Sequence, residues 1–168
     1  SNEIKKNTIY TWYIDPIDGT ANFIKNISHY NFSLALFKNN IPFYGFIINL
    51  DKGDIYSGGK KFGIFKNFKK LNIENESIFS ILYTGFPVRK KITQTYVKKQ
   101  IKLFSKFNKI RMLGSASQSL LYVALNNNDV YFEENIMVWD VAAGICLVEG
   151  SGGNIYIKKG KTIHSLNV

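Results

Sequence analysis

The stretch at residues 12–23, WYIDPIDGTANF, places two aspartates around a forced turn and constrains the fold more than any other segment. The apolar run before it predicts a buried strand that stops at Asp15–Pro16, because proline has no N–H to continue a strand ladder. Gly19 then allows a tight reversal of the backbone. The sequence therefore predicts Asp15 and Asp18 at the mouth of a strand, on either side of a turn.

These residues have the chemistry of a metal-dependent phosphate site. Carboxylate oxygens such as those of Asp15 and Asp18 are the ligands that hard divalent cations prefer. Thr20 opens a predicted short helix, and the first N–H groups of a helix have no internal partners and can bind an anion. The alternative is a turn in which Asp and Gly only satisfy the backbone. A lone D-x-x-D-G would suit that alternative, whereas the full string is much more specific.

Length and composition indicate a globular protein. The 168 residues are enough for one packed core, and 45% of them are hydrophobic and 15% aromatic. No apolar run approaches the roughly 20 residues of a membrane span, and no charged-then-apolar leader opens the sequence. The single cysteine, Cys146, lies in a run of small and apolar residues. We therefore expect no internal disulfide and a cytoplasmic protein with no membrane partner.

The formal net charge of +10 raises the possibility of a nucleic-acid partner, but the distribution of the charge argues against it. The lysines of the predicted helix 93–107 fall opposite an apolar stripe, Val97, Ile101 and Phe104, as on the solvated face of an amphipathic helix. The other basic residues occur as pairs and triplets in predicted turns. We therefore expect nucleic acid not to be a partner. A basic nucleic-acid-binding module is the alternative, and its affinity would fall steeply with salt.

The order of the predicted elements divides the chain into two parts. Residues 31–68 contain apolar runs separated by turn residues and predict a meander of antiparallel strands. After a polar segment the pattern changes to alternating strands and helices, one of which begins at the capping box Ser115–Gln118. We therefore expect a layered α/β protein with a metal- and phosphate-binding subdomain at 1–75 and an α/β subdomain at 76–168.

Two strings resemble signatures of the inositol monophosphatase family. Residues 12–23 are similar to its W-h-D-P-h-D-G-T-x-N-F, and residues 138–144, VWDVAAG, are similar to its W-D-x-A-A-G. In the second string Asp140 stands at a predicted helix start, where on its own it would be read as an N-cap. Residues 114–116 also resemble the family's G-S/T-A turn, and residues 129–133 its strand that ends in a substrate-facing acid. The resemblance covers nearly the whole chain.

The resemblance implies a layered αβαβα sugar-phosphatase fold with a mostly antiparallel first sheet and a mixed second sheet. It implies an enzyme, a Mg²⁺-dependent phosphomonoesterase that hydrolyses an inositol monophosphate or related sugar phosphate by metal-activated attack of water. Two or three Mg²⁺ ions, sensitivity to lithium and a homodimer are part of this expectation. The alternatives are a protein that binds phosphates or sugar phosphates without hydrolysis, a fructose-1,6-bisphosphatase-type enzyme and a nucleotide 3′-phosphatase.

The resemblance also implies a role for individual residues. The implied metal ligands, of which the first would bridge two ions, are Asp15, the Ile17 carbonyl, Asp18 and Asp140. The implied phosphate ligands are the backbone N–H groups of Gly19 and Thr20, and the Thr20 hydroxyl would help to orient the attacking water. The implied neighbours of the alcohol portion of the substrate are Ser115, Ala116 and Glu133.

One departure from the family pattern concerns the start of the chain. Family members carry N-terminal helices and a G-E-E motif, whose glutamate is a metal ligand that helps to activate the nucleophilic water. Here Ser1–Asn2–Glu3 stands about where the residues after that motif belong, and Glu3 lacks the motif's context. We therefore expect the chain to lack these helices, and we expect the 168 residues on their own to be inactive.

Overall fold

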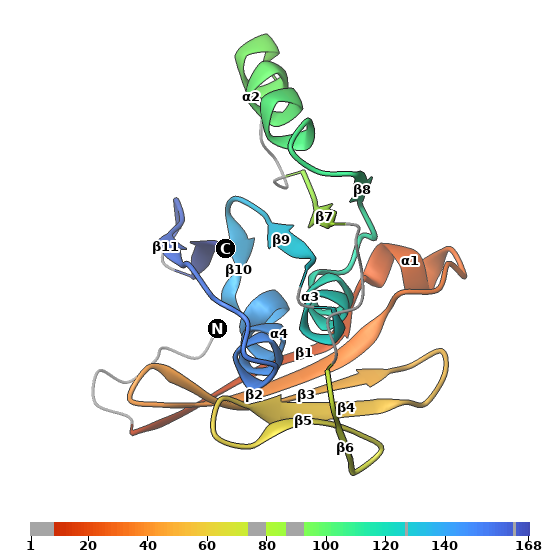
Figure 1. Ribbon diagram of the computed structural model, residues 1–168, viewed down its shortest axis with the longest axis vertical. Coiled ribbons are helices and arrows are strands. Elements are labelled where there is room, and N and C mark those ends of the chain that lie inside the picture. Colours follow the sequence, from red (N-terminus) through yellow and green to blue (C-terminus); the bar gives the residue numbers. More distant parts are fainter. Residues whose placement is uncertain (1–8, 74–79, 87–92, 127, 163) are drawn as a thin grey trace.

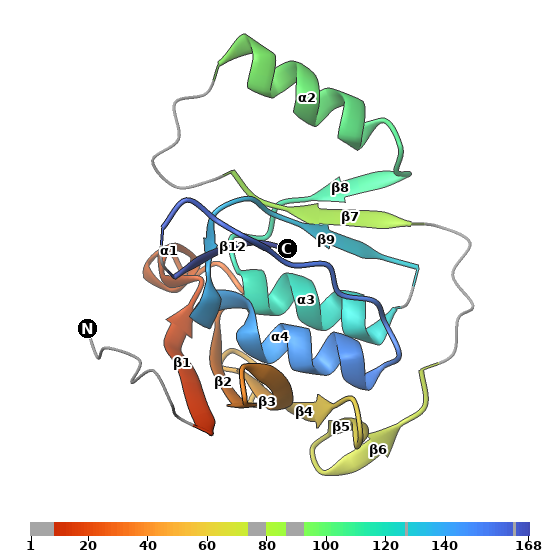
Figure 2. The same cartoon turned by 90° about the vertical axis from the view of Figure 1, so that its left-hand side faces the viewer.

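In the computed structural model, Figure 2 shows four stacked layers: helix α2 (Gln94–Phe104), a small sheet, helices α3 (Ala116–Leu125) and α4 (Val138–Gly150), and a large sheet. The structure describes residues 9–73, 80–86, 93–126, 128–162 and 164–168. This arrangement confirms the predicted layered α/β class. Among the described residues, no helix covers the outer face of the large sheet (Figure 1).

The large sheet is an antiparallel meander, as predicted for this half of the chain. Its six strands follow the chain order: β1 (Tyr10–Asp18), β2 (Asn31–Lys38), β3 (Ile41–Asn49), β4 (Ile55–Gly59), β5 (Gly63–Lys66) and β6 (Lys69–Leu71). Ala35, Phe37 and Ile47 are buried on the inner face, where α4 packs. Side chains of the outer face are half-buried or exposed, including Trp12 at 55%.

The second half of the chain supplies the remaining layers. The small sheet has parallel strands in the order β8 (Lys109–Arg111), β7 (Ile81–Thr84) and β9 (Val130–Phe132). The helices are α1 (Thr20–Ile24), α2 (Gln94–Phe104), α3 (Ala116–Leu125) and α4 (Val138–Gly150). A third, antiparallel sheet contains β10 (Ile136–Met137), β12 (Ser165–Asn167) and β11 (Lys158–Lys159). The division of the chain near residue 75 stays a prediction.

Helix α4 is the centre of the core because its small residues allow close packing on both sides. A Cβ added at Gly144 would lie 2.4 Å from the Leu120 Cβ of α3. On the other side, a Cβ at Gly45 of β3 would lie 2.7 Å from the Ala143 carbonyl oxygen. Cys146 is buried in the same helix, in keeping with its predicted place. The string A-A-G thus has a packing role.

The structure corrects the prediction that the first strand is buried and stops at Asp15–Pro16. Strand β1 continues to Asp18 through a bulge, in which two residues, Pro16 and Ile17, oppose one residue of β2. β1 is an edge strand, where a proline without N–H need not interrupt a ladder. Trp12 on its outer face is exposed because no described helix covers that face.

The structure also corrects the predicted orientation of α2. Val97 and Ile101 are exposed, whereas Tyr96 and Gln100 are buried. Both pairs have the same four-residue spacing, but the buried pair includes the polar Gln100, so the periodicity of apolar residues favours the other face. Lys99 forms an ion pair with Glu134 at 2.8 Å.

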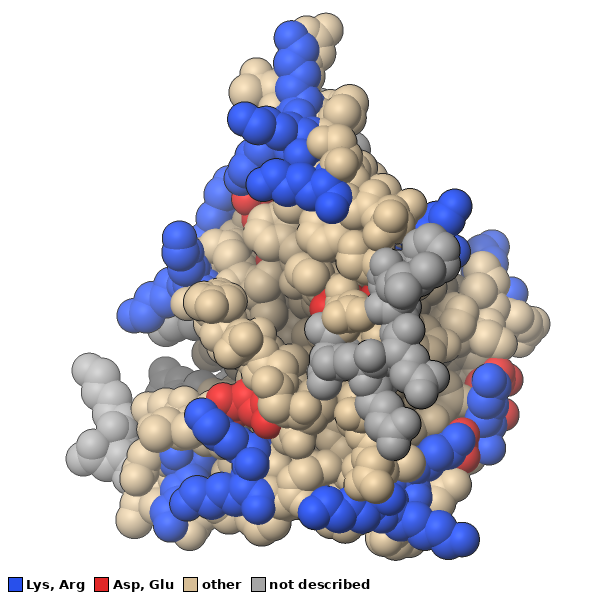
Figure 3. All heavy atoms as spheres, in the orientation of Figure 1, with Lys and Arg blue, Asp and Glu red and all other residues tan. Residues whose placement is uncertain are grey.

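The basic side chains on the face shown in Figure 3 lie in separate groups, on α2 and around the periphery, and not in one stripe. This distribution agrees with the scattered pattern that the sequence shows. Within the described residues, no helix combines the length and apolar character that crossing a membrane requires.

Candidate metal and phosphate site

The predicted carboxylates come from three elements. Asp15 and Asp18 lie at the C-terminal end of β1, on either side of its bulge. Asp140 is the third residue of α4, and Glu133 directly follows β9. The helix begins two residues before Asp140, so Asp140 is not the N-cap; its carboxylate lies beside the Met137 backbone N–H instead.

Asp18 is fixed by the start of α3. Its side chain is only 7% exposed. One carboxylate oxygen, Oδ2, accepts hydrogen bonds of 2.7 Å from the Ser115 hydroxyl and the Ser117 backbone N–H. Ser115 also caps α3, since its Oγ accepts from the Gln118 N–H at 3.2 Å, which confirms the predicted helix start at Ser115, whereas the Gln118 side-chain oxygen accepts from Asn49. The second oxygen of Asp18 has no part in these two bonds.

A buried polar network lies behind Asp18, and sequence reasoning missed it. The Asn31 side-chain amide donates to the hydroxyls of Ser115 (3.3 Å) and Ser117 (3.0 Å). Asn49 donates to the Asn31 oxygen (3.3 Å) and to the Gln118 oxygen (3.2 Å). Asn31 and Asn49 are register partners on the inner face of β2 and β3. Asn31 is the first residue of β2 and Asn49 is the last residue of β3, and both strands are otherwise mostly apolar. Two asparagines at these positions are a sequence signal that could have identified the network.

Asp15 and Asp140 are neighbouring carboxyl groups whose side chains share a hydrogen bond. Burial, and then the charge of Asp18, raises the pKa of Asp15, whose Oδ1 accepts from the Ile17 N–H at 3.1 Å. Burial, followed by the charges of Asp18 and Asp15, raises the pKa of Asp140 to about 7. These effects show that the three aspartates lie within electrostatic reach of one another. A bound cation would reverse them by stabilising the anions.

The turn after Asp18 requires a glycine. Gly19 has φ = +83°, and a Cβ there would lie 2.7 Å from the His29 carbonyl oxygen. The next residue, Thr20, begins α1 and donates its hydroxyl to the Ile17 carbonyl oxygen at 2.8 Å. The Ile17 carbonyl therefore faces the same side of the turn as the Thr20 hydroxyl.

Glu133 adds a fourth carboxylate. Its Oε2 accepts the Tyr131 hydroxyl at 2.9 Å. Burial raises the pKa of Glu133 to about 7, and the charge of Asp18 contributes, so Glu133 belongs to the same electrostatic cluster. Ser115 and Ala116, predicted beside the substrate, are buried at the start of α3 next to Asp18.

The donor set fits Mg²⁺ in chemistry, since it consists of crowded carboxylates and a carbonyl oxygen. Within the described ranges, however, no three Asp, Glu, His or Cys side chains converge closely enough to hold an ion by themselves. Mg²⁺ usually keeps several waters and takes only one or two carboxylates. The residues therefore fit an ion that is held partly by water and partly by further ligands.

The raised pKa values lead to a testable pH dependence. Asp140 and Glu133 have pKa values of about 7 in the fold, against ordinary values of 3.8 and 4.5. Between those values the folded chain binds more protons than the unfolded chain. The contribution of these two groups to the free energy of unfolding is therefore fully present below about pH 4 and is lost as the pH rises through about 7. In EDTA we expect the melting temperature to fall by several degrees, roughly 2–4 °C per kcal/mol, between pH 5 and pH 8.

Calorimetric melting curves would measure this fall, and Mg²⁺ at pH 8 should offset it. Asp140→Asn is the control, because it removes one titrating group and should flatten the slope. A melting temperature that is constant from pH 5 to pH 8 in EDTA would contradict the electrostatic account of the cluster.

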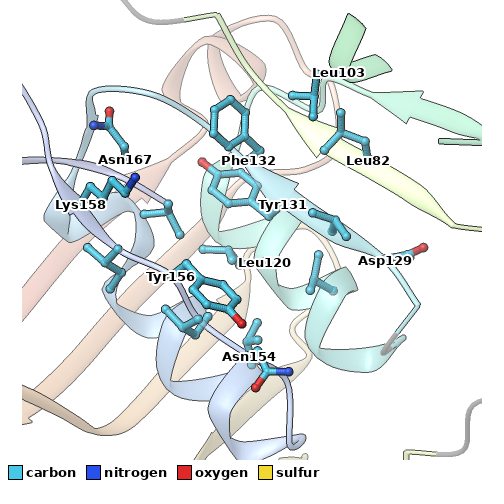
Figure 4. Close-up of a pocket in the computed structure, with 16 residues that line it drawn as sticks. Leu82, Leu103, Leu120, Asp129, Tyr131, Phe132, Asn154, Tyr156, Lys158 and Asn167 are labelled. Atoms are coloured by element: carbon cyan, nitrogen blue, oxygen red, sulfur yellow. The ribbon is translucent and has the colours of Figure 1, made fainter. Parts of the chain in front are cut away.

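A mostly apolar pocket lies apart from these carboxylates. It has a volume of about 870 Å³ and lies between α3, α4, β9 and the C-terminal segment (Figure 4). Leu82, Leu120 and Tyr156 are among its lining residues, whereas Asp15, Asp18 and Asp140 are not. The three aspartates are therefore separate from the pocket. Tyr131 connects the two regions, because its side chain lines the pocket and its hydroxyl donates to Glu133.

Comparison with known protein families gives one match across the chain. Residues 1–167 match the model of the inositol monophosphatase family. A Nus factor SuhB from Xylella fastidiosa is 36% identical over 152 residues, which are 89% of this chain and 55% of the relative. The chain thus spans just over half the length of this curated relative.

Solved structures share the fold. The inositol monophosphatase from Anabaena (Nostoc) sp. PCC 7120 superposes with a TM-score of 0.82 at 28% identity, covering 97% of this chain and 68% of that one. An IMPase/NADP phosphatase complexed with Mg²⁺ and phosphate superposes with a TM-score of 0.74 at 23% identity, covering 90% and 57%. At that identity the second likeness supports the fold alone.

Proposed function

The chain belongs to the inositol monophosphatase family, and on that basis we propose that the protein is a Mg²⁺-dependent phosphomonoesterase acting on an inositol monophosphate or a related sugar phosphate. The observation that carries this proposal is the convergence of Asp15, Asp18 and Asp140, where burial, followed by the charges of Asp18 and Asp15, raises the pKa of Asp140 to about 7. The chain spans 55% of one curated relative, so the proposal concerns the activity of the whole protein. Phosphate release from an inositol monophosphate, with and without Mg²⁺, tests it.

The proposed metal ligands are the carboxylates of Asp15, Asp18 and Asp140 and the carbonyl oxygen of Ile17. Bound Mg²⁺ would lower the pKa of a water molecule and stabilise the attacking and leaving oxygens. Asp18 is suited to this role because Ser115 and Ser117 fix one of its oxygens and leave the other for an ion.

The proposed phosphate ligands lie on the turn after Asp18. The backbone N–H groups of Gly19 and Thr20 would bind phosphate oxygens. The Thr20 hydroxyl donates to the Ile17 carbonyl, so its lone pairs can accept a hydrogen bond from a water molecule. Thr20 would therefore orient the attacking water without having to break the bond that it already makes.

We propose that Glu133, with Ser115 and Ala116, lies beside the alcohol portion of the substrate. Glu133→Gln should then raise KM for an inositol monophosphate by about tenfold, since a hydrogen bond to a charged group contributes roughly 1.5–3 kcal/mol. Hydrolysis of p-nitrophenyl phosphate should stay nearly intact, because that substrate has no hydroxyl for Glu133 to bind. Steady-state kinetics on both substrates test this, and a collapse of both activities would place Glu133 in the chemistry or the core.

A second candidate is a binding role without hydrolysis, favoured by the name Nus factor SuhB of several relatives and by the net charge of +10. If the basic groups bind nucleic acid, the affinity for a single-stranded RNA should fall linearly on a log–log plot against salt. Asp15→Asn would leave that affinity unchanged, because the carboxylate cluster has no part in it. Homodimerisation and sensitivity to lithium remain predictions, which sedimentation and inhibition by Li⁺ would test.

A further inference from the structure

The backbone of Glu133 is held in place by two hydrogen bonds to Val168. Its N–H donates to the Val168 carbonyl oxygen at 3.1 Å, and its own carbonyl accepts from the Val168 N–H at 3.1 Å. This reciprocal pair follows directly after β9, so it fixes where the Glu133 side chain starts. The direction of the carboxylate then depends on the groups that surround it.

Tyr131 holds one carboxylate oxygen. Tyr131 is the middle residue of β9 and lies two positions before Glu133. The Tyr131 hydroxyl donates to Glu133 Oε2 at 2.9 Å, while its side chain is only 8% exposed. Figure 4 shows the Tyr131 ring among the residues around the apolar pocket, near Phe132. The packed ring has little freedom, so its hydroxyl is a fixed donor.

Gly85 limits the carboxylate on another side. It directly follows β7, the neighbour of β9. A Cβ at position 85 would lie 2.6 Å from Glu133 Oε2 and 2.8 Å from Oε1. Those atoms are the far end of a flexible side chain, so an alanine here would displace the carboxylate and leave the backbone in place.

We propose that Tyr131 and Gly85 are positioning residues that fix the Glu133 carboxylate and thereby set the preference for polyol phosphates over phosphates of alcohols without further hydroxyls. The inference rests on the proposed function. Tyr131 supplies the hydrogen bond and Gly85 supplies the space, and the remaining oxygen of Glu133, Oε1, is left to accept a hydroxyl of the substrate.

The test compares Tyr131→Phe and Gly85→Ala with the unsubstituted full-length protein, using an inositol monophosphate and p-nitrophenyl phosphate. We expect each variant to raise KM for the inositol monophosphate about tenfold with kcat within about twofold, and to change p-nitrophenyl phosphate hydrolysis less than about twofold. Combining Tyr131→Phe with Glu133→Gln should add no further loss, because Tyr131 acts through Glu133. Tyr83→Phe is the matched control: Tyr83 pairs with Tyr131 across the strands, but its hydroxyl lies beside Asp129.

The outcomes separate the two claims. An unsubstituted protein that hydrolyses neither substrate would contradict the proposed function, and the present inference with it. An active protein whose KM values are unchanged in Tyr131→Phe and Gly85→Ala would overturn this inference alone. So would losses in Tyr131→Phe and Glu133→Gln that multiply in the double variant, or a Tyr83→Phe effect as large as that of Tyr131→Phe.

Discussion

Asp15→Asn is expected to weaken Mg²⁺ binding by at least about 100-fold, and Asp18→Asn by about tenfold, each factor of ten corresponding to 1.4 kcal/mol. We propose that Asp15 bridges two ions, so the amide would remove two charged contacts at once. Asp18 differs because Ser115 and Ser117 already hold one of its oxygens. Asp18 would contact one ion only, through its other oxygen, so the substitution removes a single charged contact.

Calorimetric titration of both variants with Mg²⁺ measures this difference. Asp51→Asn is the matched control, because Asp51 is exposed, bonds the Ser28 hydroxyl and lies outside the cluster. Its Mg²⁺ affinity should equal that of the unsubstituted protein. Equal and weak effects of Asp15→Asn and Asp18→Asn would contradict the assignment of the metal site.

Gly144→Ala is expected to cost about 3 kcal/mol of unfolding free energy, at the upper end of the usual range for overpacking a core. The added Cβ would lie 2.4 Å from the Cβ of Leu120. A Cβ cannot rotate away, so α3 and α4 would have to separate. Because Asp18 is bonded to the start of α3 and Asp140 lies on α4, the separation should also weaken Mg²⁺ binding.

Denaturant unfolding measures the loss of stability. Gly53→Ala is the control, because nothing lies within 4 Å of a Cβ there and only its φ of +73° opposes an alanine. Its cost should be about 1 kcal/mol, the penalty for the left-handed conformation. A Gly144→Ala variant as stable as Gly53→Ala would show that the two helices can move apart at little cost.

Local chemistry made several parts of the site predictable. Asp15, Asp18 and Asp140 lie in strings that are typical of turns and helix starts, and Ser115 caps α3 because its hydroxyl accepts from the backbone N–H three residues later. The turn at Gly19 and the start of α3 are where the sequence places them. These features depend on neighbours in the chain, which a sequence pattern can represent.

Features that depend on tertiary contacts were not predictable in the same way. Pro16 lies within β1 because β1 is an edge strand, a property of strand order and not of local sequence. Asn31 and Asn49 meet Gln118 only after β2, β3 and α3 are packed. The buried face of α2 is that of Tyr96, although a second stripe through Val97 has the same period.

Release of inorganic phosphate from an inositol monophosphate by the full-length protein is the most direct test of the proposed function. We predict turnover that stops in EDTA, returns with Mg²⁺ and is lost in Asp15→Asn, because Asp15, Asp18 and Asp140 are the proposed ligands of the ion. Turnover at the same rate in EDTA, or turnover that Asp15→Asn leaves intact, would contradict the proposed function.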